Sequence, residues 1–238
     1  MNTPEPVKSG LDLIGLGKLA QAIPPEVYKM TAATALNTFE SLVAPFTESF
    51  AGLGRLIRQK FDNWVEDQKA LGTYSLQQAL LRAKGRAEKE GKSLHPPLHA
   101  KTFLHALEEA SLETDLVLHE MWVNLLASEF VDGKSHPRFV SILAQLGPAE
   151  AKLLASLQPL PKGLSGYIGG NIAHTGMNVL WVATLDQPKQ PWNLSGTILC
   201  QQSLADVAPL DALAVKSDVL LHLTPFGQEF LTAVAPQH

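Results

Sequence analysis

Residues 118–143 have the sequence LHEMWVNLLASEFVDGKSHPRFVSIL and contain two apolar helical patterns joined by a short polar turn. In each pattern, large apolar side chains recur at the three- and four-residue spacing of one helix face. The second pattern begins at His136-Pro137, and proline is well tolerated in the first turn of a helix. Because the turn is short, we expect two neighbouring helices that pack against each other. The apolar faces consist of Leu116, Val123, Leu126 and Phe130, and then of Phe139, Ile142, Leu143 and Leu146.

The same stretch holds His119, Glu120 and His136, which are residue types found in zinc sites. A zinc-peptidase helix needs two histidines four residues apart, so that both imidazoles bind one ion, but Val123 stands four residues after His119. We therefore expect no metal site here, a surface or partly packed His119, and a His136 that serves the turn before the second helix. An alternative stays open, in which His119, Glu120, Asn124 and His136 form an enzyme or metal site with distant residues.

Helical patterns continue on both sides of this stretch, and the chain is predicted to be mainly α. The segment 91–100, GKSLHPPLHA, is predicted to be a linker, because two adjacent prolines favour extended structure. Short apolar runs typical of strands occur at Val179–Leu185, Ile198–Cys200 and Val219–Leu223. We therefore predict N-terminal amphipathic helices in 1–92, a central helical bundle in 93–158, and a small winged-helix-like α+β unit in 159–238.

Several short patterns predict where helices begin and end. Ser75 and Gln78 have the spacing of a capping box, and Ser135 is in position to cap the helix that contains Pro137. The mixed charges of residues 82–92 predict a solvated helix end. Thr224 followed by proline predicts the start of the last helix.

An amphipathic helix is predicted between residues 46 and 64, where aromatic and aliphatic residues form one continuous stripe and arginines lie on another side. One interpretation buries the stripe in the protein's own core. The other places it against a membrane surface or a protein partner, because a basic flank beside aromatic side chains suits an interface. The contact candidates are Phe46, Phe50, Leu53, Arg55, Ile57, Arg58, Phe61 and Trp64.

Composition limits the classes of function. The chain has 238 residues, a formal net charge of −4 and only 18% charged residues, so nothing in its overall charge predicts nucleic-acid binding. Residues 150–238 contain four lysines and no arginine against six acidic residues. The single cysteine, Cys200, fits a reducing compartment. With no pattern of a signal peptide or spanning helix, we expect a cytoplasmic protein, in solution or associated with a membrane surface.

The central sequence ALEEASLETDLVLHEMWVNLLASEF, followed by HPRFVSILAQLGPAEAKLLASL, resembles the core signature of the Abi-alpha family of bacterial proteins. Looser similarity extends upstream to IPPEVYKM and LVAPFTESFAGLGRLIRQKFDNW, and downstream to LLHLTPFGQEFLTAV. Residues 160–215 depart most from the family pattern, and Gly147 stands where the family often has serine. The matching positions are Trp122, Asn124, Leu125, Leu126, Ala127, His136, Pro137, Phe139, Val140, Ile142, Leu143, Leu146, Pro148, Glu150 and Ala151.

The family name implies abortive infection, in which a bacterial cell halts phage propagation at its own expense. The resemblance carries no catalytic residue and no cofactor, and the sequence contains no phosphate-binding loop or nucleophile elbow. We therefore expect a non-enzymatic protein that acts through a protein partner, self-association or a membrane surface. The alternatives are a winged-helix DNA-binding regulator and an enzyme or metal-dependent effector whose site is assembled from distant residues.

Overall fold

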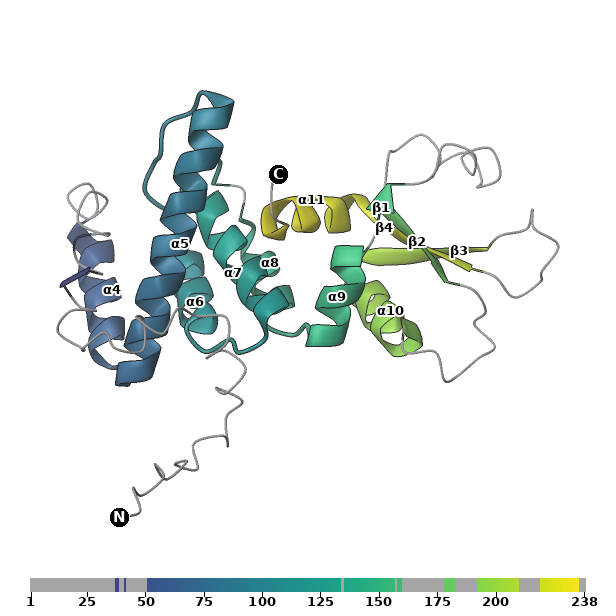
Figure 1. Cartoon of the computed structure of the whole chain (residues 1–238), viewed down its shortest axis with the longest axis horizontal. Helices are drawn as coiled ribbons and strands as arrows, with labels where there is room; N and C mark the ends of the chain where they lie inside the picture. Colours follow the sequence, from purple (N-terminus) through teal and green to yellow (C-terminus); the bar gives the residue numbers. More distant parts are fainter. Residues whose placement is uncertain are drawn as a thin grey trace, which may run out of the picture.

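The computed structural model describes residues 37, 38, 41, 51–133, 135–156, 158, 159, 178–182, 192–209 and 219–235. This part of the chain is mainly helical, as the sequence predicts, and it ends in an α+β unit (Figure 1). The helices are α4 (Ala51–Asp62), α5 (Glu66–Glu90), α6 (Ala100–Ala110), α7 (Leu116–Glu129), α8 (Pro137–Leu143), α9 (Pro148–Ser156), α10 (Trp192–Gln201) and α11 (Pro225–Val234). The strands are β1 (Gln158–Pro159), β2 (Asn178–Val182), β3 (Ala205–Pro209) and β4 (Val219–Leu223).

The long helix α5 contradicts the predicted capping box. The helix begins at Glu66, where two acidic residues in the first turn favour its positive end, so Ser75 lies in its middle. The Ser75 hydroxyl instead donates a hydrogen bond of 2.8 Å to the carbonyl oxygen of Leu71, one turn back. At its other end α5 terminates at Gly91, whose positive φ of 64° suits glycine. The predicted linker follows and leads to α6.

The other predicted helix starts are confirmed in part. Asp115 caps α7, because its carboxylate accepts from the N–H groups of Val117 and Leu118. His136, and not Ser135, caps α8, since its Nδ1 accepts from the N–H of Arg138 at 3.1 Å. Ser135 is buried and bonds the carbonyl oxygen of Leu125.

The strands form an antiparallel sheet in the order β1-β2-β4-β3, with Val179 opposite His222 and Val207 opposite Leu221. β2 and β4 lie where apolar runs predicted them. The predicted strand at Ile198–Cys200 is wrong, because these residues belong to α10, which packs against α9 and β3. Three apolar residues are too few to distinguish a strand from a helix by periodicity. The winged-helix-like description of this unit stays a prediction.

One connected apolar core runs through the described structure. It extends from Ile57 and Phe61 in α4 through Trp122 in α7 to Leu221 in β4 and Phe230 in α11. Helix α7 is buried on nearly all sides and contacts α5, α6, α9 and α11. Figure 1 shows α11 returning from the sheet toward α7. The core therefore crosses the predicted boundaries after residues 92 and 158, and the division into three units stays a prediction.

The start of α11 approaches another backbone so closely that only glycine fits there. Thr224 donates its N–H to the carbonyl oxygen of Leu204 at 3.0 Å and caps the helix by accepting from Gly227. A Cβ added to Gly227 would lie 1.8 Å from that same carbonyl oxygen. Because both partners are backbone, the clash cannot be relieved by rotating a side chain.

Replacing Gly227 by alanine is therefore expected to lower the free energy of unfolding by about 2 kcal/mol, as overpacking does in a filled core. Urea denaturation followed by circular dichroism measures the change. Gly85→Ala is the matched control, because nothing lies within 4 Å of a Cβ at that helical position. Alanine there should stabilise α5 by about 0.5–1 kcal/mol. Equal effects of the two substitutions would contradict the close approach at Gly227.

Candidate functional site

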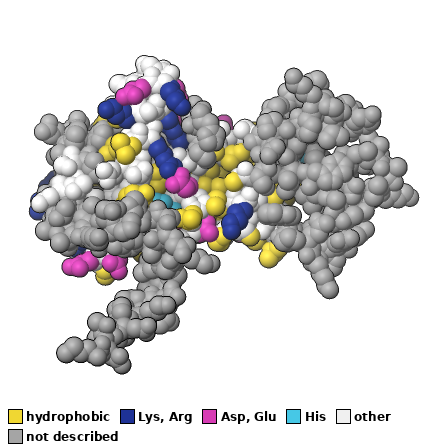
Figure 2. Space-filling view, viewed as in Figure 1, with side chains coloured by type: hydrophobic (Ala, Val, Ile, Leu, Met, Phe, Trp, Pro, Cys, Tyr) yellow, Lys and Arg dark blue, Asp and Glu magenta, His cyan; other side chains and the backbone are white. Residues whose placement is uncertain are grey.

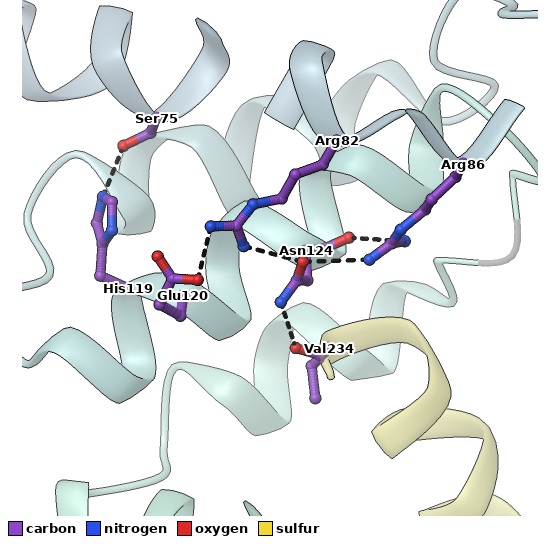
Figure 3. A network of polar contacts seen from close by, with 7 residues as sticks. All are labelled: Ser75, Arg82, Arg86, His119, Glu120, Asn124 and Val234. Carbon is purple, nitrogen blue, oxygen red and sulfur yellow. Dashed lines mark hydrogen bonds and ion pairs between the residues drawn. The ribbon is translucent and has the colours of Figure 1, made fainter. Parts of the chain in front are cut away.

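Two arginines of α5 face two polar residues of α7, and a network of hydrogen bonds joins them (Figure 3). Arg82 donates to the carboxylate of Glu120 at 2.6 Å and to Oδ1 of Asn124 at 2.9 Å. Arg86 donates to the same Oδ1 at 3.1 Å and to the backbone oxygen of Asn124 at 3.5 Å. The two arginines lie on one face of α5, because they are four residues apart. They bind α5 to α7 along this face.

Asn124 is the centre of the network and is only 1% exposed. Its carbonyl oxygen accepts from both arginines, while its Nδ2 donates to the backbone oxygen of Val234 at 3.0 Å. That oxygen lies at the end of α11, where carbonyl groups have no partner within the helix. One buried side chain therefore connects α5, α7 and the C-terminal helix.

The prediction of a solvated helix end in residues 82–92 is confirmed for Lys84 and residues 88–92 and is wrong for Arg86. Arg86 is 9% exposed. Burial lowers the pKa of its guanidinium, and the nearby carboxylate of Asp132 opposes this effect. A guanidinium stays charged in proteins, so its hydrogen bonds to Asn124 are needed to compensate for its lost hydration. The mixed charges of the sequence did not distinguish this buried arginine from its exposed neighbours.

The expectation of a surface or partly packed His119 is wrong. The imidazole is 5% exposed, lies flat against Tyr74, and has its Nε2 3.0 Å from the hydroxyl of Ser75. Burial lowers the pKa of His119 to about 4; Glu120 raises it and Arg82 lowers it further. His119 is therefore neutral at pH 7.

A serine hydroxyl next to a histidine has the residue types of a nucleophile and its base. The single hydrogen of Ser75 is directed to the carbonyl oxygen of Leu71 at 2.8 Å. With that hydrogen engaged, a bond in which Ser75 accepts from His119 requires the tautomer with the proton on Nε2. A general base would need the opposite arrangement. Both side chains are also buried, and their contact fastens α5 to α7.

The three candidates of the opening stretch have separate partners. His119 meets Ser75, Glu120 pairs with Arg82 at 2.6 Å, and the exposed His136 caps α8. Within the described ranges, no group of three or more His, Cys, Asp and Glu side chains could hold a metal ion. Asn124 is joined to Glu120 through Arg82. The geometry gives each residue a role in packing or capping.

The interpretation of the amphipathic stripe as a contact surface is wrong for three of its residues. Ile57, Phe61 and Trp64 are 3%, 1% and 8% exposed, so these three side chains belong to the core and are not available to a membrane or a partner. They are buried because α4 turns this side toward the other helices. Arg55 and Arg58 are exposed, as a contact surface would require. Phe46 and Phe50 lie outside the described residues, and so does the side chain of Leu53.

A cavity of about 530 Å³ lies next to the network, between α5, α7, α8 and α11. Its lining includes Arg86 from α5, His136 and Phe139 from the start of α8, and Phe226 and Gln228 from α11. The sequence predicted His136 to serve the turn before its helix and Phe139 to lie on an apolar helix face. It did not connect them with α11, because no local pattern shows which distant helix covers a given face.

Glu129 is a buried acid that the sequence analysis did not single out. It ends α7 and is 1% exposed, and neither carboxylate oxygen makes a hydrogen bond within the described structure. Burial raises the pKa of Glu129, and the nearby Ser135, His99 and His95 oppose this effect only in part. Its position inside the long apolar run of residues 121–131 was a signal of burial.

The raised pKa of Glu129 predicts that its contribution to stability falls as pH rises. The folded protein binds the proton more tightly than the unfolded chain, so stability is lost as the pH passes through the folded pKa. Each unit of elevation costs about 1.4 kcal/mol at high pH. We expect Glu129→Gln to lose less stability than the unmodified protein between pH 4 and pH 8 in urea denaturation.

Glu88→Gln is the control, because Glu88 is exposed on α5. Its pH profile should follow that of the unmodified protein. If Glu129→Gln gave the same profile as well, the buried carboxyl would not be a source of the pH dependence.

The signature positions of α7 and α8 form one structural unit. Trp122, Asn124, Leu125 and Leu126 are at most 1% exposed, and Phe139 is 2% exposed. Pro137 is the first residue of α8, directly after its His136 cap. The family model of abortive infection alpha matches residues 75–179, a range that includes both helices and the arginines of α5. Residues 75–179 are thus similar to the Abi-alpha family. No curated protein and no solved structure matches the chain.

The Abi-alpha match therefore includes the residues of α5 and α7 that form the hydrogen-bond network, while α11 lies outside the matched range. It confirms the family resemblance in the central sequence. No helix in the described part of the chain has both the length and the apolar character needed to cross a membrane.

Proposed function

We propose that this Abi-alpha protein is a phage-defence factor that acts by contact with a protein partner, without catalysing a reaction. The family match over residues 75–179 is the observation that carries the proposal. The family description names abortive infection, so the expected outcome of its action is reduced phage propagation in the bacterial cell. Residues 150–238 carry few positive charges, and nucleic acid is therefore not the partner we propose.

The proposal that the protein acts by contact is supported by the hydrogen bonds that its polar side chains make within the bundle. Ser75 and His119, a pair with the residue types of a nucleophile and its base, are both buried, and the Ser75 hydroxyl donates to the carbonyl oxygen of Leu71. Glu120 is engaged by Arg82, and Asn124 binds two arginines and a backbone oxygen. These groups stabilise the bundle, which leaves action to its surface.

The outer side of α4 is the surface we propose for the contact. Leu56 is 50% exposed, Arg55 and Arg58 are exposed on the same helix, and Val65 just after the helix is 68% exposed. The other side of α4 is fixed in the core by Ile57 and Phe61. An exposed apolar side chain on a helix that also carries exposed arginines suits an acidic protein surface, a second copy of the chain or an anionic membrane surface. We favour a protein partner, since the aromatic residues Phe61 and Trp64 are buried.

Phage challenge of bacteria with and without the gene tests the proposal. We expect the gene to lower the plating efficiency of at least one phage in a broad panel. Leu56→Asp should remove this protection, because it places a negative charge at the centre of the proposed contact, where the partner would bury it. Leu116→Asp is the matched control, since Leu116 is 47% exposed but belongs to α7.

Two results would count against the proposal in different ways. Unchanged plating of every phage would remove the defence role. Protection that survives Leu56→Asp would exclude the outer side of α4 as the contact surface. Sedimentation with anionic liposomes distinguishes a membrane surface from a protein partner. If a membrane is the partner, the full chain should sediment with the liposomes and the Leu56→Asp variant should not.

A further inference from the structure

The segment that joins α5 to α6 lies against the end of α7, and we call its residues 94–99 the strap. The N–H of His95 donates to the carbonyl oxygen of Phe130 at 3.0 Å, one residue beyond α7. Leu98 lies against Gly133, where an added Cβ would come within 2.5 Å of the leucine Cδ1. These contacts hold the strap on α7, although Leu98 is still 61% exposed.

The strap lies between two helix ends and has a stiff middle. Helix α5 ends at Gly91, and α6 begins at Ala100, directly after His99, whose side chain makes no capping hydrogen bond. Pro96 and Pro97 favour extended backbone and restrict its bending. The segment can therefore move away from α7 as one piece.

Glu129, the last residue of α7, is a buried acid next to the strap. It is 1% exposed, and neither carboxylate oxygen makes a hydrogen bond within the described structure. The titratable groups that act on it, His95 and His99, both belong to the strap, while the turn before α8 contributes the hydroxyl of Ser135. That hydroxyl donates to the carbonyl oxygen of Leu125 at 3.1 Å. The carboxyl group of Glu129 is therefore covered without being paired.

A neutral carboxyl group suits this position better than a carboxylate. Ionisation with the strap in place would leave a negative charge with neither water nor a hydrogen-bond donor. His95 is half-buried and His99 is exposed, so water screens the charge that they carry when protonated. Burial accordingly raises the pKa of Glu129, and the two histidines oppose this effect only in part. Because that pKa lies above the ordinary value, the packed strap is favoured at low pH and loses stability as the pH rises through it.

We propose that the strap opens when Glu129 loses its proton and closes when the proton returns. Opening admits water to the carboxylate, which relieves the unfavourable burial of its charge. It breaks the bond from His95 to Phe130 and separates Leu98 from Gly133, so it requires less free energy than unfolding of the core. The strap is thus a pH-sensitive switch at the end of α7. This assignment does not depend on the proposed role in phage defence.

Hydrogen exchange of the His95 N–H in the full chain measures the opening, because this amide is bonded to Phe130 while the strap is closed. NMR gives its exchange rate between pH 5 and pH 8, and division by the intrinsic rate at each pH gives an opening constant. We expect this constant to increase with pH, approaching tenfold per unit above the pKa of Glu129. In Glu129→Gln it should stay nearly constant, because an amide does not titrate. Glu88→Gln is the control and should behave as the unmodified protein does, since Glu88 is exposed on α5 and outside the network of the two arginines.

The N–H of Leu126, in the buried part of α7, reports unfolding of the whole bundle in the same experiment. We expect its opening constant to be at least tenfold smaller than that of His95 at pH 8. The proposal is overturned if the two amides open together, if the His95 constant of the unmodified protein does not change with pH, or if Glu129→Gln shows the same increase. The first two results need no variant, so they decide the question even where Glu129→Gln does not fold.

Discussion

Asn124→Ala is expected to lower the free energy of unfolding by about 4 kcal/mol. The substitution removes the acceptor of Arg82 at 2.9 Å and of Arg86 at 3.1 Å, together with the donor to Val234 at 3.0 Å. Arg86 would remain buried with its charge poorly compensated, and breaking one partner of a buried charged pair typically costs about 3–5 kcal/mol. Urea denaturation at pH 7 measures the loss.

The matched control is Asn63→Ala, at an exposed asparagine in the turn after α4. It should change stability by less than about 0.5 kcal/mol, as is usual for surface substitutions. A second readout separates the network from a general packing defect. Hydrogen exchange of α11 should increase in Asn124→Ala, since the variant loses the bond to Val234. Equal stability of the two variants would refute a central role for Asn124.

Because of His119, the free energy of unfolding is expected to fall by about 3 kcal/mol when the pH is lowered from 7 to 4. Its folded pKa of about 4 lies below the ordinary value of 6.5, because burial disfavours the imidazolium. The unfolded chain therefore binds the proton more readily. The stability is fully present above pH 6.5 and is lost as the pH falls toward the folded pKa, by about 1.4 kcal/mol per unit of difference.

His119→Gln isolates this effect, since glutamine can still donate to Ser75 but has no group that titrates in this range. Comparing the variant with the unmodified protein at pH 7 and at pH 4 cancels contributions from other groups, including Glu129. His105→Gln serves as the control, because His105 is half exposed beside Glu109. An NMR titration gives a direct check. A midpoint of His119 near 6.5 would show that the imidazole is solvated.

The helices α7, α8 and α11 could be predicted, because α7 and α8 have apolar residues with a regular period and α8 and α11 begin at a proline. Thr224 with Pro225 defined the start of α11, and the structure confirms both. Ser75 and Ser135 gave misleading signals. A capping residue is predicted from its neighbours in sequence alone. Ser75 has such neighbours but lies within a helix that begins at Glu66, and Ser135 donates to the carbonyl oxygen of Leu125 in α7 instead of capping α8.

The candidate site was less predictable, because its contacts join residues distant in sequence. The partner of His119 is Ser75, and the partner of Asn124 on one side is Val234. Periodicity shows that a helix has a buried face but not which polar groups meet across it. Two signals were nevertheless present. Arg82 and Arg86 share one face of α5, and Glu129 stands within an apolar run, where an acid needs a structural explanation.

The central claim is that the polar residues of the bundle hold its helices together and take no part in a reaction. Phage plating on cells that carry Ser75→Ala, or the triple variant His119→Gln, Glu120→Gln and His136→Asn, tests it most directly. These substitutions remove the hydroxyl, the imidazoles and the carboxylate, while amides retain much of the hydrogen bonding. We expect both proteins, once shown to be folded and present at normal levels, to protect as the unmodified protein does. Loss of protection in either folded variant would contradict the claim and identify a reacting centre in α5 and α7.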